Sequence, residues 1–225
     1  MPPKSKAPVR RVLIVDDHPM MRTGLAQLIG SEPDLKVVAE ADNARQGLEA
    51  VSKLALDLVL LDISLPDKSG LELLKDIRAV RPELPVLVVS MHDELVFAER
   101  VLRAGGRGYI MKQEGGQKYL QAIRQVLAGQ IYVSEKMSAR ILENLSGSPA
   151  QKTGTSPVQR LSDREFEVFQ LIGQGLGTRE IAQRLHLSVK TIEVHRINIK
   201  EKLQVKTATE LVRFAVRWAD AQAKS

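Results

Sequence analysis

Short apolar runs alternate with longer amphipathic stretches over residues 1–128 of the chain. Three of the runs, at residues 12–15, 58–61 and 86–89, lack polar alternation, which is typical of strands covered by helices on both faces. The alternation therefore predicts repeated strand–helix units and a parallel sheet in an α/β fold. We expect five strands, at residues 11–15, 36–39, 58–61, 86–89 and 108–111. We expect helices at residues 20–29, 44–53, 70–80, 95–104 and 117–127.

The pattern changes after residue 128. A further helix is expected at residues 134–145, and it leads into residues 146–160, where Gly and Pro stand among small polar residues. That composition predicts a linker, which would span roughly 20 Å if it is flexible. Beyond the linker we expect an all-α domain of four helices, because the apolar positions have helical spacing only. The expected divisions are a basic tail at 1–10, an α/β domain at 11–128, a helix and linker at 129–160 and a helical domain at 161–225.

Capping residues stand at the expected starts of the C-terminal helices. Two pairs have the spacing of a capping box, in which each side chain bonds a backbone N–H group near the other: Ser162 with Glu165, and Thr207 with Glu210. Thr178 and Ser188 are expected to be simpler N-caps.

The composition is that of an ordinary globular protein, with 44% hydrophobic and 27% charged residues. The chain has no cysteine, which excludes disulfides and cysteine-based zinc sites or nucleophiles. We expect a cytoplasmic protein without membrane contact, because no apolar run has signal-peptide or membrane-spanning length. Lys and Arg exceed Asp and Glu by five in residues 129–225 and by one in residues 1–128. This excess is a modest indication of a polyanionic partner.

Polar residues stand where the expected parallel strands end. Asp16 and Asp17 end the first strand and Asp62 the third. Ser90 ends the fourth strand and Lys112 the fifth. Because parallel strands place their ligand site beyond their carboxyl ends, these side chains are expected to form one site. Each residue alone would more often be a helix cap, a turn former or a surface charge, but five at successive strand ends are hard to explain in that way.

These groups suit phosphoryl transfer. Converging carboxylates repel one another unless a hard cation lies between them, and oxygen ligands of this kind suit Mg²⁺. Asp62 can act as the nucleophile and form an acyl phosphate. The metal would be held by Asp62, Asp16, Asp17 and the backbone carbonyl of Ser64. The phosphoryl oxygens would be bound by the Ser90 hydroxyl and the Lys112 ammonium.

The N-terminal domain resembles the receiver domains of two-component response regulators. The resemblance covers about residues 10–128 and rests on the segments VLIVDDHP, LLDISLPDKSGLEL, VVSMH and GYIMK. It implies a flavodoxin-like, doubly wound fold of five parallel strands, and phosphotransfer from a sensor histidine kinase to Asp62. It also implies that Ser90 and Tyr109 form a switch pair, in which the hydroxyl moves toward the phosphoryl group and the aromatic ring turns inward.

Residues 178–203 have the length of a helix-turn-helix. On a helical wheel of residues 188–203, one face is expected to pack on the domain: Ile192, His195, Ile199 and Leu203. The opposite face carries Lys190, Glu193, Val194 and Ile197. A charge pair beside two branched apolar residues suits a DNA major groove, where apolar groups contact thymine methyls and charged groups reach bases. Phosphate contacts are expected from Arg179, Arg184, Arg196, Lys200, Lys202 and Lys206.

Residues 161–218 are similar to the LuxR/NarL/FixJ type of helix-turn-helix domain. The match runs through residues such as Glu165, Gly175, Ile181, Thr191 and His195. The resemblance implies binding of double-stranded DNA by Arg179, Lys190, Thr191, Glu193, Val194, Arg196, Ile197 and Lys200. It further implies dimerisation through the last helix, where a helical stripe is formed by Leu211, Phe214, Ala215 and Trp218. The spacing of this stripe fits an intradomain core equally well.

Together these features predict a response regulator of the NarL/FixJ type, which is not an enzyme and which forms a homodimer when phosphorylated. One alternative is a metal-dependent phosphatase, which is disfavoured because no second nucleophile or general base accompanies Asp62. The other is an interaction protein that binds a protein or RNA. The exposed face expected at residues 190–197 argues against this second alternative.

Overall fold

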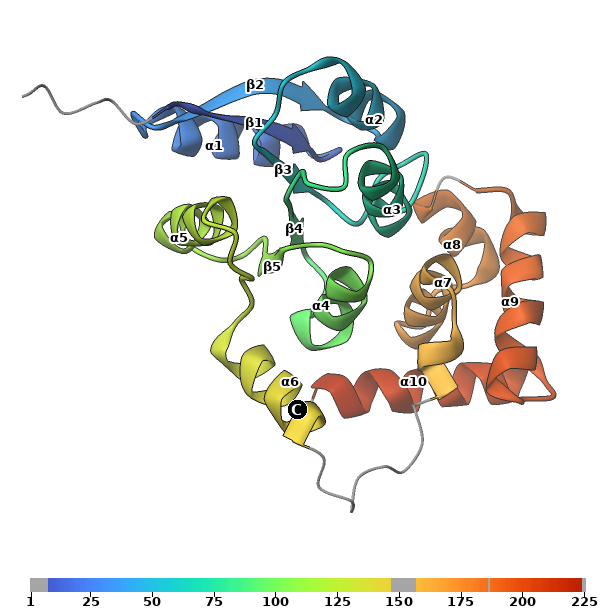
Figure 1. Cartoon of the computed structure of the whole chain (residues 1–225). Coiled ribbons are helices and arrows are strands. Elements are labelled where there is room, and N and C mark those ends of the chain that lie inside the picture. Colours follow the sequence, from blue (N-terminus) through green and yellow to red (C-terminus); the bar gives the residue numbers. More distant parts are fainter. Residues whose placement is uncertain (1–7, 147–156, 186, 224–225) are drawn as a thin grey trace, which may run out of the picture. The chain divides into compact units, whose positions relative to one another are not determined.

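The computed structural model describes residues 8–146, 157–185 and 187–223. It divides the chain into two compact units, Met1–Ser146 and Gly147–Ser225 (Figure 1). The first unit contains every strand of the described residues, and the second is built from helices. This division agrees with the change of pattern along the sequence.

A five-stranded parallel sheet forms the centre of the first unit. Its strands are β1 (Arg10–Val15), β2 (Leu35–Ala41), β3 (Leu58–Leu61), β4 (Val86–Ser90) and β5 (Gly108–Met111). Their order is β2-β1-β3-β4-β5, which is the flavodoxin-like doubly wound order. The expected strands are therefore confirmed. The edge strand β2 is longer than the apolar run that predicted it, because only some of its residues are buried.

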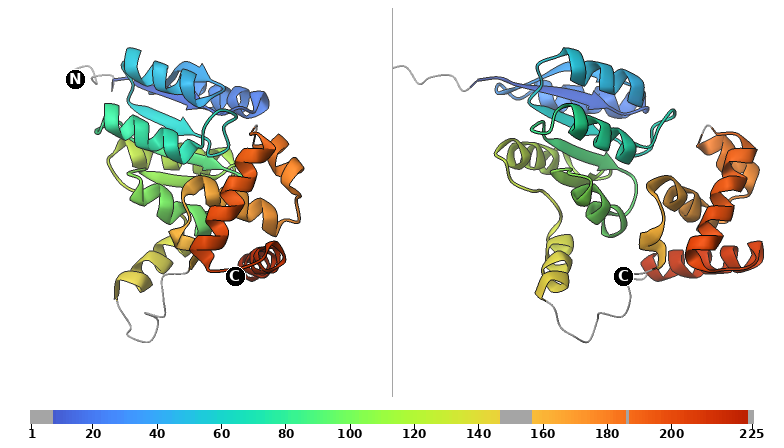
Figure 2. Two further views of the ribbon diagram at one scale, coloured as in Figure 1. Left: turned by 90° about the vertical axis from the view of Figure 1, so that its right-hand side faces the viewer. Right: turned by 45° about the vertical axis from the view of Figure 1, so that its right-hand side comes forward.

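Helices cover both faces of this sheet (Figures 1 and 2). Helices α1 (Pro19–Gly30) and α5 (Gly116–Leu127) pack on one face, where Ile29 and Ile123 meet the β1 residues Val12 and Ile14. On the other face are α2 (Ala44–Lys53), α3 (Gly70–Val80) and α4 (Glu94–Arg103). Burial on both faces explains why the central strands are continuous apolar runs.

The chain after α5 returns to the sheet instead of leaving it. Tyr132 pairs with Gly108 at the edge of β5, and the backbone N–H of Tyr109 donates to the Tyr132 carbonyl over 2.9 Å. Helix α6 (Glu135–Ser146) follows, and its Met137 is buried. The helix expected beyond the receiver thus belongs to the first unit. Of the expected linker, residues 147–156 lie outside the described residues, as do residues 1–7 of the basic tail.

The second unit begins earlier than expected, with the 3₁₀ helix η2 (Pro157–Arg160), whose Val158 is buried. Four helices follow: α7 (Asp163–Gly173), α8 (Thr178–Arg184), α9 (Val189–Leu203) and α10 (Ala208–Ala223). The expected caps at Ser162 and Ser188 and the box of Thr207 with Glu210 are confirmed. The expected N-cap at Thr178 is wrong. Gly177 takes that place, and its backbone N–H donates to the Glu180 carboxylate over 2.7 Å.

The apolar stripe of α10 packs inside its own domain. Leu211 and Ala215 are fully buried. The Trp218 ring lies edge-on to the rings of Phe166 and Phe169 on α7, each with a centroid distance of 5.5 Å, and the Phe214 ring also contacts Phe169. A second chain cannot reach Leu211 and Ala215, whereas Phe214 and Trp218 are half-buried, so a dimer role for this stripe stays a prediction.

Candidate functional site

The sheet brings the predicted acidic residues together at its carboxyl edge. Asp16 and Asp62 are buried, with 2% of each side chain exposed, while 32% of the Asp17 side chain is exposed. One ligand atom from each of these carboxylates and one from His18 all lie within 4.8 Å of one another. The adjacent strands β1 and β3 produce this convergence, because their ends are in register and Asp62 N–H donates to the Val15 carbonyl.

Lys112 reaches this acidic cluster from the end of β5. Its Nζ lies 2.7 Å from Asp62 Oδ2 and 2.8 Å from Asp16 Oδ2, and only 6% of its side chain is exposed. Burial opposes its charge, but the two carboxylates raise the pKa of Lys112 above its ordinary value. Burial raises the pKa of Asp62 to about 6, against the opposing effect of Lys112. One ammonium group therefore compensates only part of the negative charge collected here.

The cluster fits a divalent cation with oxygen ligands. Within the described chain, the buried oxygens Asp16 Oδ2 and Asp17 Oδ1 make no hydrogen bond of adequate geometry, although each has a nitrogen within ion-pair distance. Carboxylate oxygens without hydrogen bonds, grouped at a strand edge, are the donors that Mg²⁺ and similar ions use. Ser64 is placed beside them, since its backbone N–H donates to the Asp62 carboxylate. Its carbonyl as a metal ligand stays a prediction.

A glycine allows the Asp62 loop to adopt this position. Gly70 begins α3, and a Cβ atom built on it would lie 2.1 Å from the Asp62 carbonyl oxygen and 2.7 Å from the Ile63 Cα. The backbone N–H of Gly70 donates to the Ile63 carbonyl over 2.7 Å. The start of α3 therefore packs directly on the backbone of Asp62 and Ile63, and a side chain at position 70 would displace one of these segments.

The two expected switch residues are joined through the loop that follows β4. Ser90 is buried, and its Oγ accepts a hydrogen bond of 3.2 Å from the His92 backbone N–H. The Tyr109 hydroxyl donates to the His92 carbonyl over 2.7 Å, and the ring is fully buried. The inward turn of the ring, expected as a response to phosphorylation, is therefore already present in this structure.

Sequence reasoning missed His18. This residue precedes α1, and its Nδ1 lies 2.6 Å from Asp17 Oδ1 and 3.2 Å from Asp16 Oδ1, while 61% of its side chain is exposed. The signal was available, because His18 directly follows the acidic pair, and a residue at the start of the next helix turns back over the strand end. A histidine at that place is a nitrogen donor within an otherwise oxygen-based site.

Helix α9 presents the two faces that the wheel predicted. Ile192, Ile199 and Leu203 are buried, and the opposite face is exposed, with Val194 and Ile197 at 49% and 50%. Lys190 and Glu193 are exposed on that same face. The helix starts at the Ser188 cap, where the hydroxyls of Ser188 and Thr191 lie 2.7 Å apart. Two half-exposed branched residues on one polar helix remain unusual for a surface in contact with water alone.

The basic residues around α9 are not equivalent. Arg179 is exposed, and Lys200 and Arg196 are half-buried; burial lowers the pKa of Arg196. Lys202 instead makes an ion pair within the domain, since its Nζ lies 2.6 Å from Glu165 Oε2 in the capping box of α7. The expected phosphate contact by Lys202 would have to break this ion pair.

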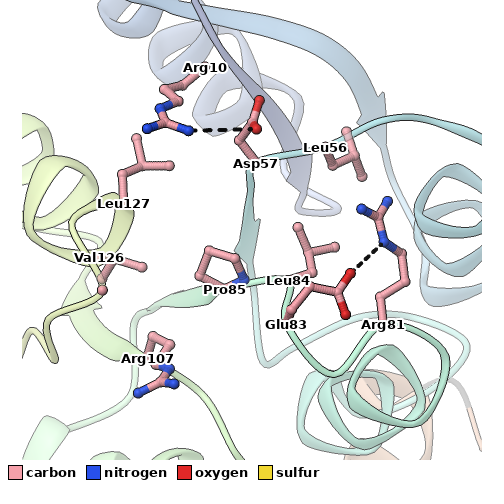
Figure 3. Close-up of a pocket in the computed structure, with 11 residues that line it drawn as sticks. Arg10, Leu56, Asp57, Arg81, Glu83, Leu84, Pro85, Arg107, Val126 and Leu127 are labelled. Atoms are coloured by element: carbon pink, nitrogen blue, oxygen red, sulfur yellow. Dashed lines mark hydrogen bonds and ion pairs between the residues drawn. The ribbon is translucent and has the colours of Figure 1, made fainter. Parts of the chain in front are cut away.

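A pocket lies at the amino ends of the strands, on the side of the sheet opposite to the acidic cluster. It has a volume of about 330 Å³ and is lined by residues that include Arg10, Asp57 and Arg107 (Figure 3). Several charged side chains around this pocket pair with one another: Arg10 pairs with Asp57 and Arg81 pairs with Glu83. No described helix combines the length and apolar character needed to cross a membrane.

Comparisons with known proteins identify both units. A family model described as "Response regulator receiver domain" matches residues 12–124, and one described as "Bacterial regulatory proteins, luxR family" matches residues 159–215. The oxygen regulatory protein NreC of Staphylococcus aureus (strain JH9) is 36% identical over 210 residues, which are 92% of this chain and 97% of NreC. The chain belongs to the two-component response regulators of the NarL/FixJ type. Members of this family regulate transcription and are not enzymes.

Solved structures show the same architecture. RcsB from Salmonella enterica serovar Typhimurium, in a structure bound to promoter rprA in the presence of the phosphomimetic BeF₃⁻, is 26% identical with a TM-score of 0.61; the match covers 92% of this chain and 98% of that chain. A LuxR-family two-component response regulator from Aurantimonas sp. SI85-9A1 is 32% identical with a TM-score of 0.57, and the match covers 62% of this chain and 99% of that chain. These similarities confirm the predicted fold class.

Proposed function

We propose that this response regulator accepts a phosphoryl group on Asp62 from a sensor histidine kinase and thereby changes how its C-terminal domain binds DNA. The observation that carries the proposal is the convergence of Asp62 with two further buried or half-buried carboxylates and Lys112 at the end of the receiver sheet. Since its target is the chromosome, we place the protein in the cytoplasm.

The groups present account for each step of the transfer. The Asp62 carboxylate attacks phosphorus in line, the bond to the donor nitrogen breaks, and an acyl phosphate forms. Lys112, which already contacts Asp62 Oδ2, pairs with a phosphoryl oxygen, and the Ser90 hydroxyl supplies a second donor. A Mg²⁺ ion held by Asp16, Asp17, Asp62 and the Ser64 carbonyl would neutralise charge on the phosphoryl oxygens. No general base is required, because the nucleophile is already a carboxylate.

The exposed face of α9 is the proposed DNA-reading surface. Val194 and Ile197 would meet thymine methyls, and Glu193 would accept from a cytosine amine. Lys190 and Thr191 lie at the N-terminal end of the helix, which the helix-turn-helix arrangement directs at base edges. Phosphate contacts are proposed for Arg179, Arg196 and Lys200.

Two substitutions on α9 should separate affinity from specificity. We expect Lys200→Ala to weaken binding to all sequences alike and to reduce the dependence on salt, because it removes one phosphate contact. We expect Glu193→Ala to cost about 1 to 3 kcal/mol at particular bases and to relax specificity there. Selection from a randomised duplex library measures both effects. Equal base preferences for wild type and Glu193→Ala would remove that residue from the reading surface.

The described contacts offer a route from the acceptor to the linker. The loop of Ser90 and His92 holds the Tyr109 hydroxyl, and the Tyr109 backbone pairs with Tyr132. Directly after this loop, Glu94 at the start of α4 accepts a hydrogen bond of 2.7 Å from the Ser134 backbone N–H just before α6. A shift of Ser90 toward a phosphoryl group would therefore reach the segment that leads to the second domain. Because Tyr109 is already inward, we assign the switch to this loop and not to rotation of the ring alone.

We propose that phosphorylation favours a homodimer whose two helix-turn-helix domains bind paired half-sites. One helix-turn-helix usually binds weakly, and pairing two half-sites about one helical turn apart multiplies affinity. RcsB has been solved as "two RcsB dimers bound to two parallel DNAs". In this proposal the contact surface is the accessible part of α10, which includes the half-buried Phe214 and Trp218 of the stripe and Val212, which is 37% exposed. The alternative is release of an inhibitory contact between the domains.

A fragment of residues 157–225 distinguishes these two switches. If dimerisation alone controls binding, the fragment should bind DNA no better than the unphosphorylated full chain, and sedimentation should show a larger mass with phosphodonor. The DNA affinities of the fragment and the full chain are measured on the same duplex, and affinity and mass are measured at the same salt concentration. Tighter binding by the fragment, or an unchanged mass while DNA affinity rises, would favour release of docking and contradict the dimerisation switch.

A further inference from the structure

The imidazole of His18 enters the acidic cluster from the solvent side. Its Nδ1 lies 2.6 Å from Asp17 Oδ1, 3.2 Å from Asp16 Oδ1 and 3.9 Å from Asp62 Oδ2. It also lies 3.4 Å from Lys112 Nζ. One ring nitrogen thus faces all three carboxylates that the receiver uses for a cation, while most of the ring surface remains exposed.

Local backbone geometry holds the ring in this place. The His18 backbone N–H donates to Asp16 Oδ1 over 2.9 Å, which folds the chain back over the end of β1. Pro19 then starts α1 and restricts the backbone that follows. The position of the ring therefore follows from the same turn that places Asp16. A lone pair on Nδ1 would point toward the carboxylate oxygens of the cluster. Such a lone pair requires a proton or a cation between it and those oxygens.

We propose that His18 Nδ1 is an additional protein ligand to the receiver cation and makes this site favour a transition ion such as Mn²⁺ or Co²⁺ over Mg²⁺. The inference rests on the proposed function of the acidic cluster. Mg²⁺ takes oxygen ligands, whereas imidazole nitrogen binds first-row transition ions, whose affinity for mixed sites rises from Mn²⁺ toward Cu²⁺. One nitrogen among three carboxylates is the kind of donor set in which these preferences differ.

The spacing of the donors permits a shared ion after small side-chain shifts. Ligands at about 2.1 Å from one octahedral ion stand about 3 Å apart when adjacent. The 3.2 Å separation from His18 Nδ1 to Asp16 Oδ1 is close to this spacing. The 3.9 Å separation to Asp62 Oδ2 must shorten, and the 2.6 Å separation to Asp17 Oδ1 must lengthen. His92, the other histidine of the receiver domain, lies outside the cluster and has its Nε2 3.0 Å from Ser64 Oγ.

Metal titrations of the full chain test this assignment. Free Mn²⁺ is followed by its electron paramagnetic resonance signal, Mg²⁺ is added as competitor, and electron spin echo modulation detects a ¹⁴N nucleus bound to Mn²⁺. We expect nitrogen modulation in the wild type, its loss in His18→Asn, and a loss of about tenfold in the preference for Mn²⁺ over Mg²⁺. Asparagine is a favoured N-cap, so this variant should retain α1. His92→Asn is the matched control and should keep both the modulation and the preference.

The outcomes separate the ligand assignment from the site itself. Nitrogen modulation that is absent from the wild type, or that persists in His18→Asn, would overturn the role of His18, as would an unchanged ion preference. Asp17→Ala should lose binding of both ions. If the wild type binds neither ion, the metal part of the proposed function fails and this inference fails with it.

Discussion

Asp62→Asn is expected to reduce phosphorylation by acetyl phosphate and Mg²⁺ to background. Asparagine keeps the shape of the side chain but removes the nucleophilic oxygen, and neither Asp16 nor Asp17 occupies the position of Asp62 at the end of the central strand β3. Labelling with radioactive phosphodonor, followed by hydroxylamine treatment to detect the acyl phosphate, measures the effect. The predicted result is a complete loss of hydroxylamine-sensitive label.

Asp76→Asn provides the control for this prediction. Asp76 lies on α3 in the same domain, pairs with Lys68 and is not part of the acidic cluster. We expect it to label like the wild type. Equal labelling of Asp62→Asn and the wild type would show that another residue accepts the phosphoryl group.

Gly70→Ala should be the most disruptive small substitution in the receiver. Its Cβ would lie 2.1 Å from the Asp62 carbonyl oxygen, so either α3 or the acceptor loop must move. We expect a loss of about 1 to 3 kcal/mol in the free energy of unfolding, as for other overpacked sites, together with slower phosphorylation. Urea denaturation and the rate of labelling measure the two effects.

Gly24→Ala is the matched control, because Gly24 is also in a helix but has no atom within 4 Å of a built Cβ. Alanine favours a helix over glycine, so this change should raise the free energy of unfolding by about 0.5 to 1 kcal/mol. If Gly→Ala lowers the free energy of unfolding at position 70 and raises it at position 24, the destabilisation is due to the clash with the Asp62 backbone. Equal stability of both variants would contradict the packing described for Gly70.

The acidic cluster could be predicted because it depends on the ends of parallel strands. The apolar runs at residues 58–61 and 86–89 locate two strands, and the polar residues directly after them must meet at one edge. Asp62, Ser90 and Lys112 were found in this way. The recognition face of α9 was predictable for a related reason, because helical periodicity fixes which side chains share a side.

Other features depend on contacts that periodicity does not specify. The stripe of Leu211 and Ala215 is equally compatible with a core and an interface, and only the packing of α10 on α7 decides between them. The N-cap of α8 was predicted one residue too late. The cap is Gly177, whose backbone N–H donates to the Glu180 carboxylate, and not the Thr178 hydroxyl. His18 was missed because its place in the cluster depends on how the chain turns after β1, which the sequence does not specify directly.

The central claim is that a phosphoryl group on Asp62 controls DNA binding. Its most direct test is the affinity of the full chain for a library-selected duplex, measured at one salt concentration with and without phosphodonor, for the wild type and Asp62→Asn. The account predicts that phosphodonor raises the affinity of the wild type and leaves Asp62→Asn unchanged. An equal response of the two proteins, or no response of a wild type shown to be phosphorylated, would contradict it.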